Sequence, residues 1–225
     1  MKRILLILSA LLISVVIFSG CNCNQEEQGL SLYVSQLRSD VFEGQSQNYT
    51  LHAEYGYTEN PYLADGKIGN KEYSLKFRLI GKQTDQATYV IVFEHGGKTF
   101  EKAFSLSPNR HALTCEMQID GFNLKEFTVS IGTYDQKENL TLKSTLPKDV
   151  LDYKGALKAL EKNQAKLLDN YRNSDGVFTA EIYARVLVKE GKAYWYIGIA
   201  SDSGSIKALL IDAQNGNVLA IRDVF

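Results

Sequence analysis

Apolar and polar residues alternate through much of residues 30–146. In segments 49–57 and 73–79 nearly every second residue is apolar, and the residues between them are mostly polar. This period of two predicts strands that pack one face on a core and turn the other to water. The continuous apolar run at 89–93 predicts a strand that is buried on both faces. The alternation therefore predicts a β-rich fold for this part of the chain.

Turn residues separate these predicted strands at short intervals. The segment 95–98 (HGGK) predicts a hairpin and Asp120-Gly121 a further turn, because glycine readily adopts a positive φ. About seven short strands in this order predict an antiparallel β-sandwich over residues 30–146. An immunoglobulin-like topology is one option, although the cysteine and tryptophan signature of true immunoglobulin domains is absent.

The hydrophobic period changes to 3.6 after Pro147, which ends the strand pattern. A helix is predicted from an N-cap at Asp152 to about residue 173. Its apolar stripe consists of Tyr153, Leu157, Leu160, Leu167, Leu168 and Tyr171. Four strands are predicted after it, at 177–188, 193–200, 206–211 and 218–224. One helix on a four-stranded antiparallel sheet predicts a second, small α+β domain over residues 147–225.

The C-terminal segments 194–200 (YWYIGIA), 206–213 (IKALLIDA) and 215–219 (NGNVL) resemble the PepSY module. That family ends its strands in a Val/Ile-Asp-Ala-x-Thr-Gly-x-Val segment, and Asn215 stands here where threonine is usual. The resemblance covers about residues 151–225 and implies a noncatalytic interaction role outside the cell. Physically, the motif predicts a turn, with Asp212 and Asn215 bonding local amides and Gly216 in the left-handed region.

The N-terminus has the pattern of a targeting segment. Lys2 and Arg3 precede an apolar stretch at 4–18, which is shorter than the ~20 residues of a membrane-spanning helix. The sequence Phe18-Ser19-Gly20-Cys21 resembles the bacterial lipobox, although leucine is commonest at the place of Phe18. The resemblance implies cleavage after residue 20 and a diacylglyceryl group on Cys21, with residues 21–29 as a polar tether. The alternative is an uncleaved membrane anchor; either way the rest lies outside the cytoplasm.

Composition and charge narrow the classes of function. With 44% hydrophobic and 23% charged residues, the chain has the composition of a folded protein. Loss of Lys2 and Arg3 would leave 23 basic residues against 26 acidic ones, a net charge of −3, and no basic cluster suggests a nucleic-acid partner. No Gly-rich phosphate loop or metal-ligand spacing points to a cofactor. Cys115 is predicted to be a small buried residue, with pairing to Cys23 as the alternative.

The residues that could support catalysis are scattered along the sequence. The three histidines, His52, His95 and His111, fall on a polar strand face, beside a turn and before a strand. None is spaced as the base of an obvious catalytic set, so the chain is predicted not to be an enzyme. A hydrolase built from scattered carboxylates is the third reading.

Two aromatic groups are candidates for binding. Tyr194, Trp195 and Tyr196 form a possible partner-binding patch, in which the two tyrosines share one strand face and the tryptophan takes the other. Tyr57, Tyr62 and Asp65 form a possible ligand loop, unless Tyr57 continues the core face of its strand. The sequence thus predicts a noncatalytic lipoprotein that binds an envelope protein, with a peptidase as one candidate. Binding of carbohydrate or cell-wall glycan is the alternative.

Overall fold

The computed structural model describes residues 29–81, 88–107 and 112–224. A short 3-10 helix, η1 (Leu30–Tyr33), leads directly into the first strand. The helices are α2 (Tyr153–Asn163) and α3 (Ala165–Asp169). The strands before them are β1 (Val34–Gln45), β2 (Tyr49–Glu59), β3 (Lys71–Gly81), β4 (Tyr89–His95), β5 (Lys98–Ala103), β6 (Ser105–Leu106), β7 (Leu113–Gln118), β8 (Glu126–Thr133) and β9 (Lys137–Ser144). The strands after them are β10 (Glu181–Lys189), β11 (Lys192–Ala200), β12 (Ile206–Asp212) and β13 (Val218–Val224).

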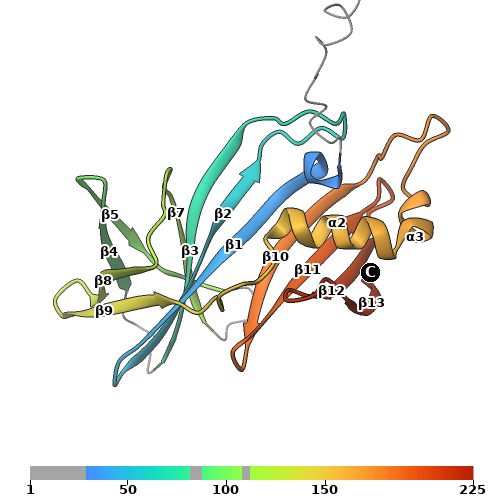
Figure 1. Cartoon of the computed structure of the whole chain (residues 1–225). Helices are drawn as coiled ribbons and strands as arrows, with labels where there is room; N and C mark the ends of the chain where they lie inside the picture. Colours follow the sequence, from blue (N-terminus) through green and yellow to red (C-terminus); the bar gives the residue numbers. More distant parts are fainter. Residues whose placement is uncertain (1–28, 82–87, 108–111, 225) are drawn as a thin grey trace, which may run out of the picture.

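The 13 strands of the described residues form one hydrogen-bonded sheet (Figure 1). Its main path runs β13-β12-β11-β10-β1-β2-β3-β7-β6. The strands β9, β8, β4 and β5 branch from β1, since Phe42 and Glu43 near its far end pair with Ser144 and Lys143 of β9. The other end of β1 pairs in parallel with β10, from Val34 to Arg38. Strand β1 is therefore the element that joins the two halves of the chain.

The predicted β-sandwich followed by a separate α+β domain with its own four-stranded sheet is wrong. The four C-terminal strands do form where they were expected, but they continue the same sheet through the parallel pairing of β1 with β10. Val34 faces Ile182 in that pairing. Hydrophobic periodicity reports which residues of a strand are buried, but it carries no information about a partner so distant in sequence.

The helix begins as predicted. The side chain of Asp152 accepts a hydrogen bond from the amide of Gly155 at 2.8 Å, which is the N-cap interaction. The helix ends earlier than predicted, at Asn163, and the chain resumes as the short helix α3 after Gln164. The predicted stripe is nevertheless found inside, with Leu157, Leu160 and Leu168 buried.

The turn between β12 and β13 also matches its prediction. The carboxylate of Asp212 accepts from the amide of Gln214 at 2.8 Å, and the side-chain oxygen of Asn215 accepts from the amide of Asn217 at 2.9 Å. Gly216 has a φ of +76°, in the region that favours glycine. These local bonds hold the hairpin in a fixed shape.

Two hydrophobic cores lie on the same face of the sheet. One lies under α2 and η1 and includes Trp195, Ile197 and Leu209. The other lies between β1–β3 and the branch β4, β8 and β9, and includes Phe77 and Phe93. Tyr57 in the first core and Tyr55 in the second are two residues apart on β2, so they point to the same side. The opposite side of the central strands therefore belongs to neither core.

Candidate functional site

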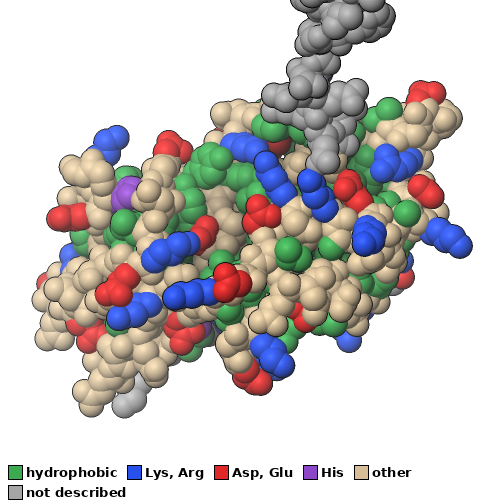
Figure 2. Space-filling view, viewed as in Figure 1, with side chains coloured by type: hydrophobic (Ala, Val, Ile, Leu, Met, Phe, Trp, Pro, Cys, Tyr) green, Lys and Arg blue, Asp and Glu red, His purple; other side chains and the backbone are tan. Residues whose placement is uncertain are grey.

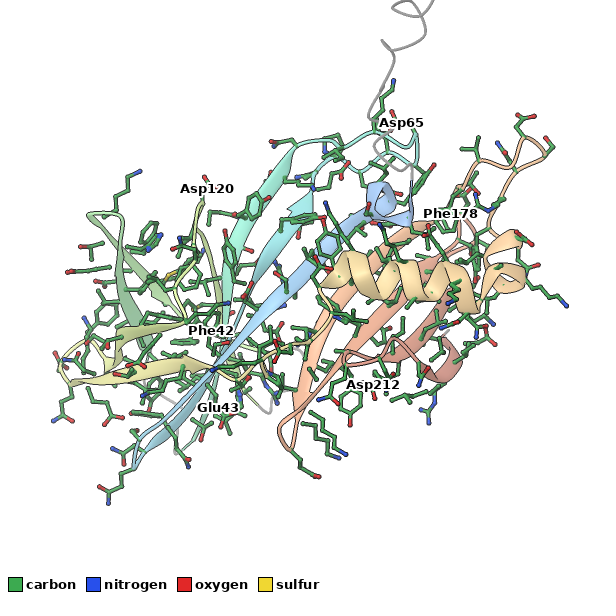
Figure 3. The ribbon with its side chains drawn as sticks, in the orientation of Figure 1. Phe42, Glu43, Asp65, Asp120, Phe178 and Asp212 are labelled. Carbon is green, nitrogen blue, oxygen red and sulfur yellow. The ribbon has the colours of Figure 1, made fainter. Side chains whose placement is uncertain are left out.

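The side of the central strands opposite the two cores carries a dense set of charged residues, called here the charged face. Its members are Arg38, Glu43, His52, Glu54, Lys76, Arg78, Glu116 and Arg185. The alternation of the strands places them there. Phe42 and Glu43, neighbours on β1 and both labelled in Figure 3, show it: Phe42 is 2% exposed in the core, whereas Glu43 is exposed. Strand register then brings opposite charges together, with Lys76 of β3 between Glu54 of β2 and Glu116 of β7.

Arg38 is the buried centre of the charged face. Its side chain is 8% exposed, and one guanidinium nitrogen lies 2.9 Å from Oε1 of Glu116. The other terminal nitrogen donates to Oγ of Ser74 at 3.3 Å, and that hydroxyl donates to the same Glu116 oxygen at 2.5 Å. These bonds compensate for the desolvation of the guanidinium group. The charge of Arg38 is therefore held in one place beneath a more exposed surface.

Two further pairs flank Arg38. Arg185 of β10 forms an ion pair with Glu54 of β2, which connects strands that β1 separates. Nδ1 of His52 lies 3.3 Å from Oε2 of Glu43, and both side chains are substantially exposed. Exposed pairs of this kind add little to stability, so their side chains remain available to exchange one partner for another.

The charged face is hollowed in two places that adjoin each other. One hollow of about 250 Å³ lies where β10 and β1 diverge, and its walls include Val41 and Val188. The other, of about 390 Å³, lies beside the half-buried rings of Tyr183 and Tyr196. Both hollows share Glu54, Lys76, Arg185 and Leu187. The shared walls make them one groove that crosses the strands.

Tyr183 gives this groove a hydrogen-bonding group that stays protonated. Burial raises the pKa of Tyr183 to about 12, and the hydrogen bond and charge of Glu181 act in the same direction. The hydroxyl donates to Oε2 of Glu181 at 2.8 Å. At neutral pH the ring therefore offers a neutral edge next to the charged pairs.

The predicted partner-binding patch is divided between the two sides of the sheet. Trp195 is 2% exposed, and its indole nitrogen donates to the carbonyl oxygen of Leu151 at 2.8 Å. It is a core residue under α2 and presents no surface to a partner. Tyr194 and Tyr196 are half-buried on the other side, as the alternation predicted, and Tyr196 lines the groove.

The predicted ligand loop is divided in a similar way. Tyr57 is 3% exposed and continues the core face of β2, which was the alternative reading. Tyr62 is half-buried, and its hydroxyl donates to the carbonyl oxygen of Ala180 at 3.2 Å. Asp65 is exposed, and its carboxylate accepts from the amide of Lys67 at 2.9 Å. None of the three side chains lines the groove of the charged face.

The histidines and the predicted lipidation site lie in different parts of the chain. His52 belongs to the charged face, whereas the ring of His95 lies between Phe93 and Phe122, at centroid distances of 5.9 and 5.4 Å. His111 and the predicted lipidation site Cys21 lie outside the described residues, as do the signal segment and most of the tether. Within residues 29–81, 88–107 and 112–224, no group of three or more His, Cys, Asp or Glu could hold a metal ion.

Cys115 is buried, as predicted, at 7% exposure, and its thiol is free. Burial raises the pKa of this thiol to about 12. A thiol in such surroundings is a poor nucleophile, because the thiolate is its reactive form. Its predicted alternative partner, Cys23, lies outside the described residues.

Sequence reasoning missed the charged face as a site. The alternation did place Lys76 and Arg78 on a solvent side, which was the only available signal. What it lacked was the strand order that brings Arg185 to Glu54 and Arg38 to Glu116.

Comparison with protein-family models and with curated proteins finds no match to this chain. The PepSY and lipobox resemblances therefore stay predictions that depend on the residues quoted for them. In the part of the chain that the structure describes, neither α2 nor α3 has the length and apolar character required to cross a bilayer.

Proposed function

We propose that this protein is a noncatalytic lipoprotein of the cell envelope that binds another envelope protein with its charged face. The observation that carries the proposal is the groove on that face. It crosses β10, β1, β2 and β3, and charges of both signs line it at Arg38, Glu54, Lys76 and Arg185. Such a surface is complementary to a polypeptide that carries both acidic and basic side chains. A peptidase is one candidate partner, as the PepSY resemblance implies.

Two observations favour a protein over a glycan. Tyr55 and Tyr57, which could have stacked on sugar rings, are 8% and 3% exposed. The walls shared by the two hollows are charged side chains and Leu187, and the rings of Tyr183 and Tyr196 beside the second hollow are half-buried. Glycan binding remains the competing hypothesis for the same groove.

The noncatalytic part of the proposal is supported by the surroundings of the histidines. His52 faces a carboxylate of similar exposure, and His95 packs between phenylalanine rings. The contacts given for these two histidines among the described residues are a carboxylate and aromatic rings, whereas an activated nucleophile needs a hydroxyl or thiol beside its base.

The test places a photo-crosslinking amino acid at Leu187, in the groove, in the protein in its native membrane. The matched control is Leu106, an exposed leucine on β6 outside the groove. We expect one discrete protein adduct from position 187 and none from 106. The adduct should be lost when Lys76→Gln and Arg185→Gln are combined. Saturable binding to cell-wall polysaccharide, with no adduct, would instead support the glycan hypothesis. Intact mass with a Cys21→Ala control tests the lipid anchor separately.

A further inference from the structure

The groove of the charged face opens beside a short stretch of unpaired strand edge. Strand β10 pairs with β1 only as far as Arg185, which faces Arg38 in the last pairing. In Figure 1 the two strands separate beyond this pairing, and β1 continues toward β9. Strand β10 extends through residues 186–189, which pair with β11 alone among the described strands. The side of β10 that faced β1 is therefore left without a strand partner over these residues.

The turn after β10 determines which backbone groups lie on this edge. Glu190 and Gly191 form a two-residue turn, with φ angles of +52° and +73°. Positive φ at both positions is typical of a type I′ turn. Lys189 and Lys192 flank the turn as a pair that exchanges both hydrogen bonds. Because such pairs alternate with pairs that are not hydrogen-bonded, Val188 directs its N–H and C=O away from β11, into the space that β1 has left.

The opposite wall of this space is covered by the chain itself. The segment after β9 runs along β1 there, and the amide of Thr145 donates to the carbonyl oxygen of Val41 at 3.0 Å. Between the two walls lies the hollow of about 250 Å³, which is lined by Val41, Thr145 and residues 186–188. Proteins usually pair, cover or blunt the edges of their sheets. Here the edge of β1 is covered, whereas the edge of β10 at Val188 opens into the hollow.

The side chains around the edge define what can pair with it. Val188 and Val41 are both partly buried against the core under α2, and they line the hollow from opposite walls. Leu187 is 36% exposed and points to the charged face, beside the ion pair of Arg185 and Glu54. A residue that pairs with Val188 would place its side chain between Val188 and Val41. Its two neighbours would point the other way, beside Leu187 and the ion pair.

The edge can be reached from solvent along the β10–β11 turn. Figure 2 shows that this turn projects from the lower edge of the molecule, with charged side chains at its tip. Lys189, Glu190 and Lys192 are exposed there. Charged residues at the end of an edge strand discourage unselective pairing with other sheets. A partner that enters beside the turn therefore has to suit both the charges at the tip and the apolar walls of the hollow.

We propose that the envelope protein binds by adding an extended segment of its own chain to β10 at Val188. An extended backbone supplies a C=O for the N–H of Val188 and an N–H for its C=O at the same time. The segment carries an apolar residue opposite Val188 and polar neighbours beside Leu187. This inference rests on the proposed function, because it needs a protein partner. It adds the form in which that partner is recognised, which is a single strand.

The test removes one backbone donor in the full chain, which carries the photo-crosslinking amino acid at position 187 in its native membrane. Val188→Pro removes the N–H and places a ring on the edge, while the bonds to β11 are kept because this amide points away from β11. Val188→Ile keeps the N–H and an apolar β-branched side chain, so it is the matched control. We expect Val188→Pro to lower the yield of the adduct at least about tenfold. Val188→Ile should leave the yield within about twofold of the unchanged edge.

Hydrogen exchange gives a second readout, which contacts between side chains would not change. In the purified free protein, the amide of Val188 should exchange faster than the amide of Leu187, which is bonded to β11. In the purified adduct, exchange at Val188 should slow at least about tenfold. The fold of each variant is checked by the emission of Trp195, which is 2% exposed and faces Val186 in the β10–β11 pairing. If Val188→Pro unfolds, exchange in the chain with Val188 unchanged is the deciding measurement.

The outcomes distinguish this inference from the proposed function. An adduct that persists in folded Val188→Pro, or that leaves exchange at Val188 unchanged, would overturn strand addition. The proposed function would then stand, because the partner would bind through side chains alone. An adduct of twice the mass of this chain would show a second copy at the edge and would overturn the choice of partner in both proposals. Absence of any adduct from position 187 with Val188 unchanged would overturn both.

Discussion

The indole nitrogen of Trp195 donates a hydrogen bond to the carbonyl oxygen of Leu151 at 2.8 Å. The amide of Leu151 donates in turn to the carbonyl oxygen of Ala213 at 2.7 Å. These two bonds hold the chain against β11 and the β12–β13 turn, two residues before α2 begins. The sheet therefore fixes the chain just before the start of the helix, and Trp195 makes one of the two bonds that do so.

Replacing this tryptophan tests the contact. Trp195→Phe removes the donor, leaves the carbonyl of Leu151 without its partner, and opens space under the helix. We expect a loss of about 1–3 kcal/mol in the free energy of unfolding. Urea unfolding followed by far-UV circular dichroism measures it without depending on tryptophan fluorescence. Tyr194→Phe, on the other side of the same strand, should change stability by less than about 0.5 kcal/mol.

The network around Arg38 predicts an asymmetric response to mutation. Glu116→Ala leaves a guanidinium that is 8% exposed without its carboxylate, and should cost about 1–3 kcal/mol. Combining Arg38→Met with Glu116→Leu should cost less than Glu116→Ala alone, because no buried charge is then left unpaired. The comparison is made between the denaturant midpoints of the unchanged protein, Glu116→Ala and the double variant. A double variant less stable than Glu116→Ala would contradict this account of the pair.

Gly56 of β2 pairs with Arg38 of β1, next to the point where the register of the two strands shifts. A Cβ at this position would lie 1.8 Å from the carbonyl oxygen of Leu37, which is a backbone atom. Gly56→Ala should therefore force the two strands apart and cost about 3 kcal/mol or more. Gly198→Ala is the control, because a Cβ there would meet only side chains at 3.3 Å and beyond. Comparable unfolding midpoints for the two variants would refute the prediction.

Cys115 predicts a loss of stability at alkaline pH. Burial raises the pKa of its thiol to about 12, whereas a thiol in the unfolded chain titrates near about 8.5. Between these values the folded protein keeps a proton that the unfolded chain has lost, so a rise in pH favours unfolding. Tyr183, with its pKa raised to about 12, acts in the same direction above about pH 10.

Thermal unfolding between pH 7 and pH 11 measures this dependence. The melting temperature should be flat below about pH 8 and fall above it. The fall should be shallower for Cys115→Ala than for the unchanged protein, after both are referred to their own values at pH 7. An equal slope in the two proteins would show that the thiol does not contribute.

The features that could be predicted from the sequence are local ones. The N-cap at Asp152, the turn at Asp212 and the buried side of β2 each depend on residues a few positions apart. A short segment is enough to determine the hydrogen bonds within a turn and the buried side of a strand. The parallel pairing of Val34 with Ile182 joins distant segments and could not be predicted in this way, and the predicted architecture is wrong because of it.

The candidate site depended even more on distant contacts. Lys76 and Arg78 could be assigned to a solvent side, but nothing local indicates that Arg185 meets Glu54. Tyr57 and Trp195, which were candidates for binding in the sequence, are core residues. Large aromatic side chains contribute much buried area, so they are more often part of a core than of a binding surface.

The position of β1 between β2 and β10 has a consequence for the order of folding. Its partner β2 follows within a few residues, but its other partner over Val34–Arg38 begins only at Glu181. During synthesis, most of the chain must therefore be made while one edge of the first strand is unpaired. Unpaired edges invite aggregation, and contacts between distant segments form slowly. The sheet therefore cannot close along this edge of β1 until the last third of the chain has been made.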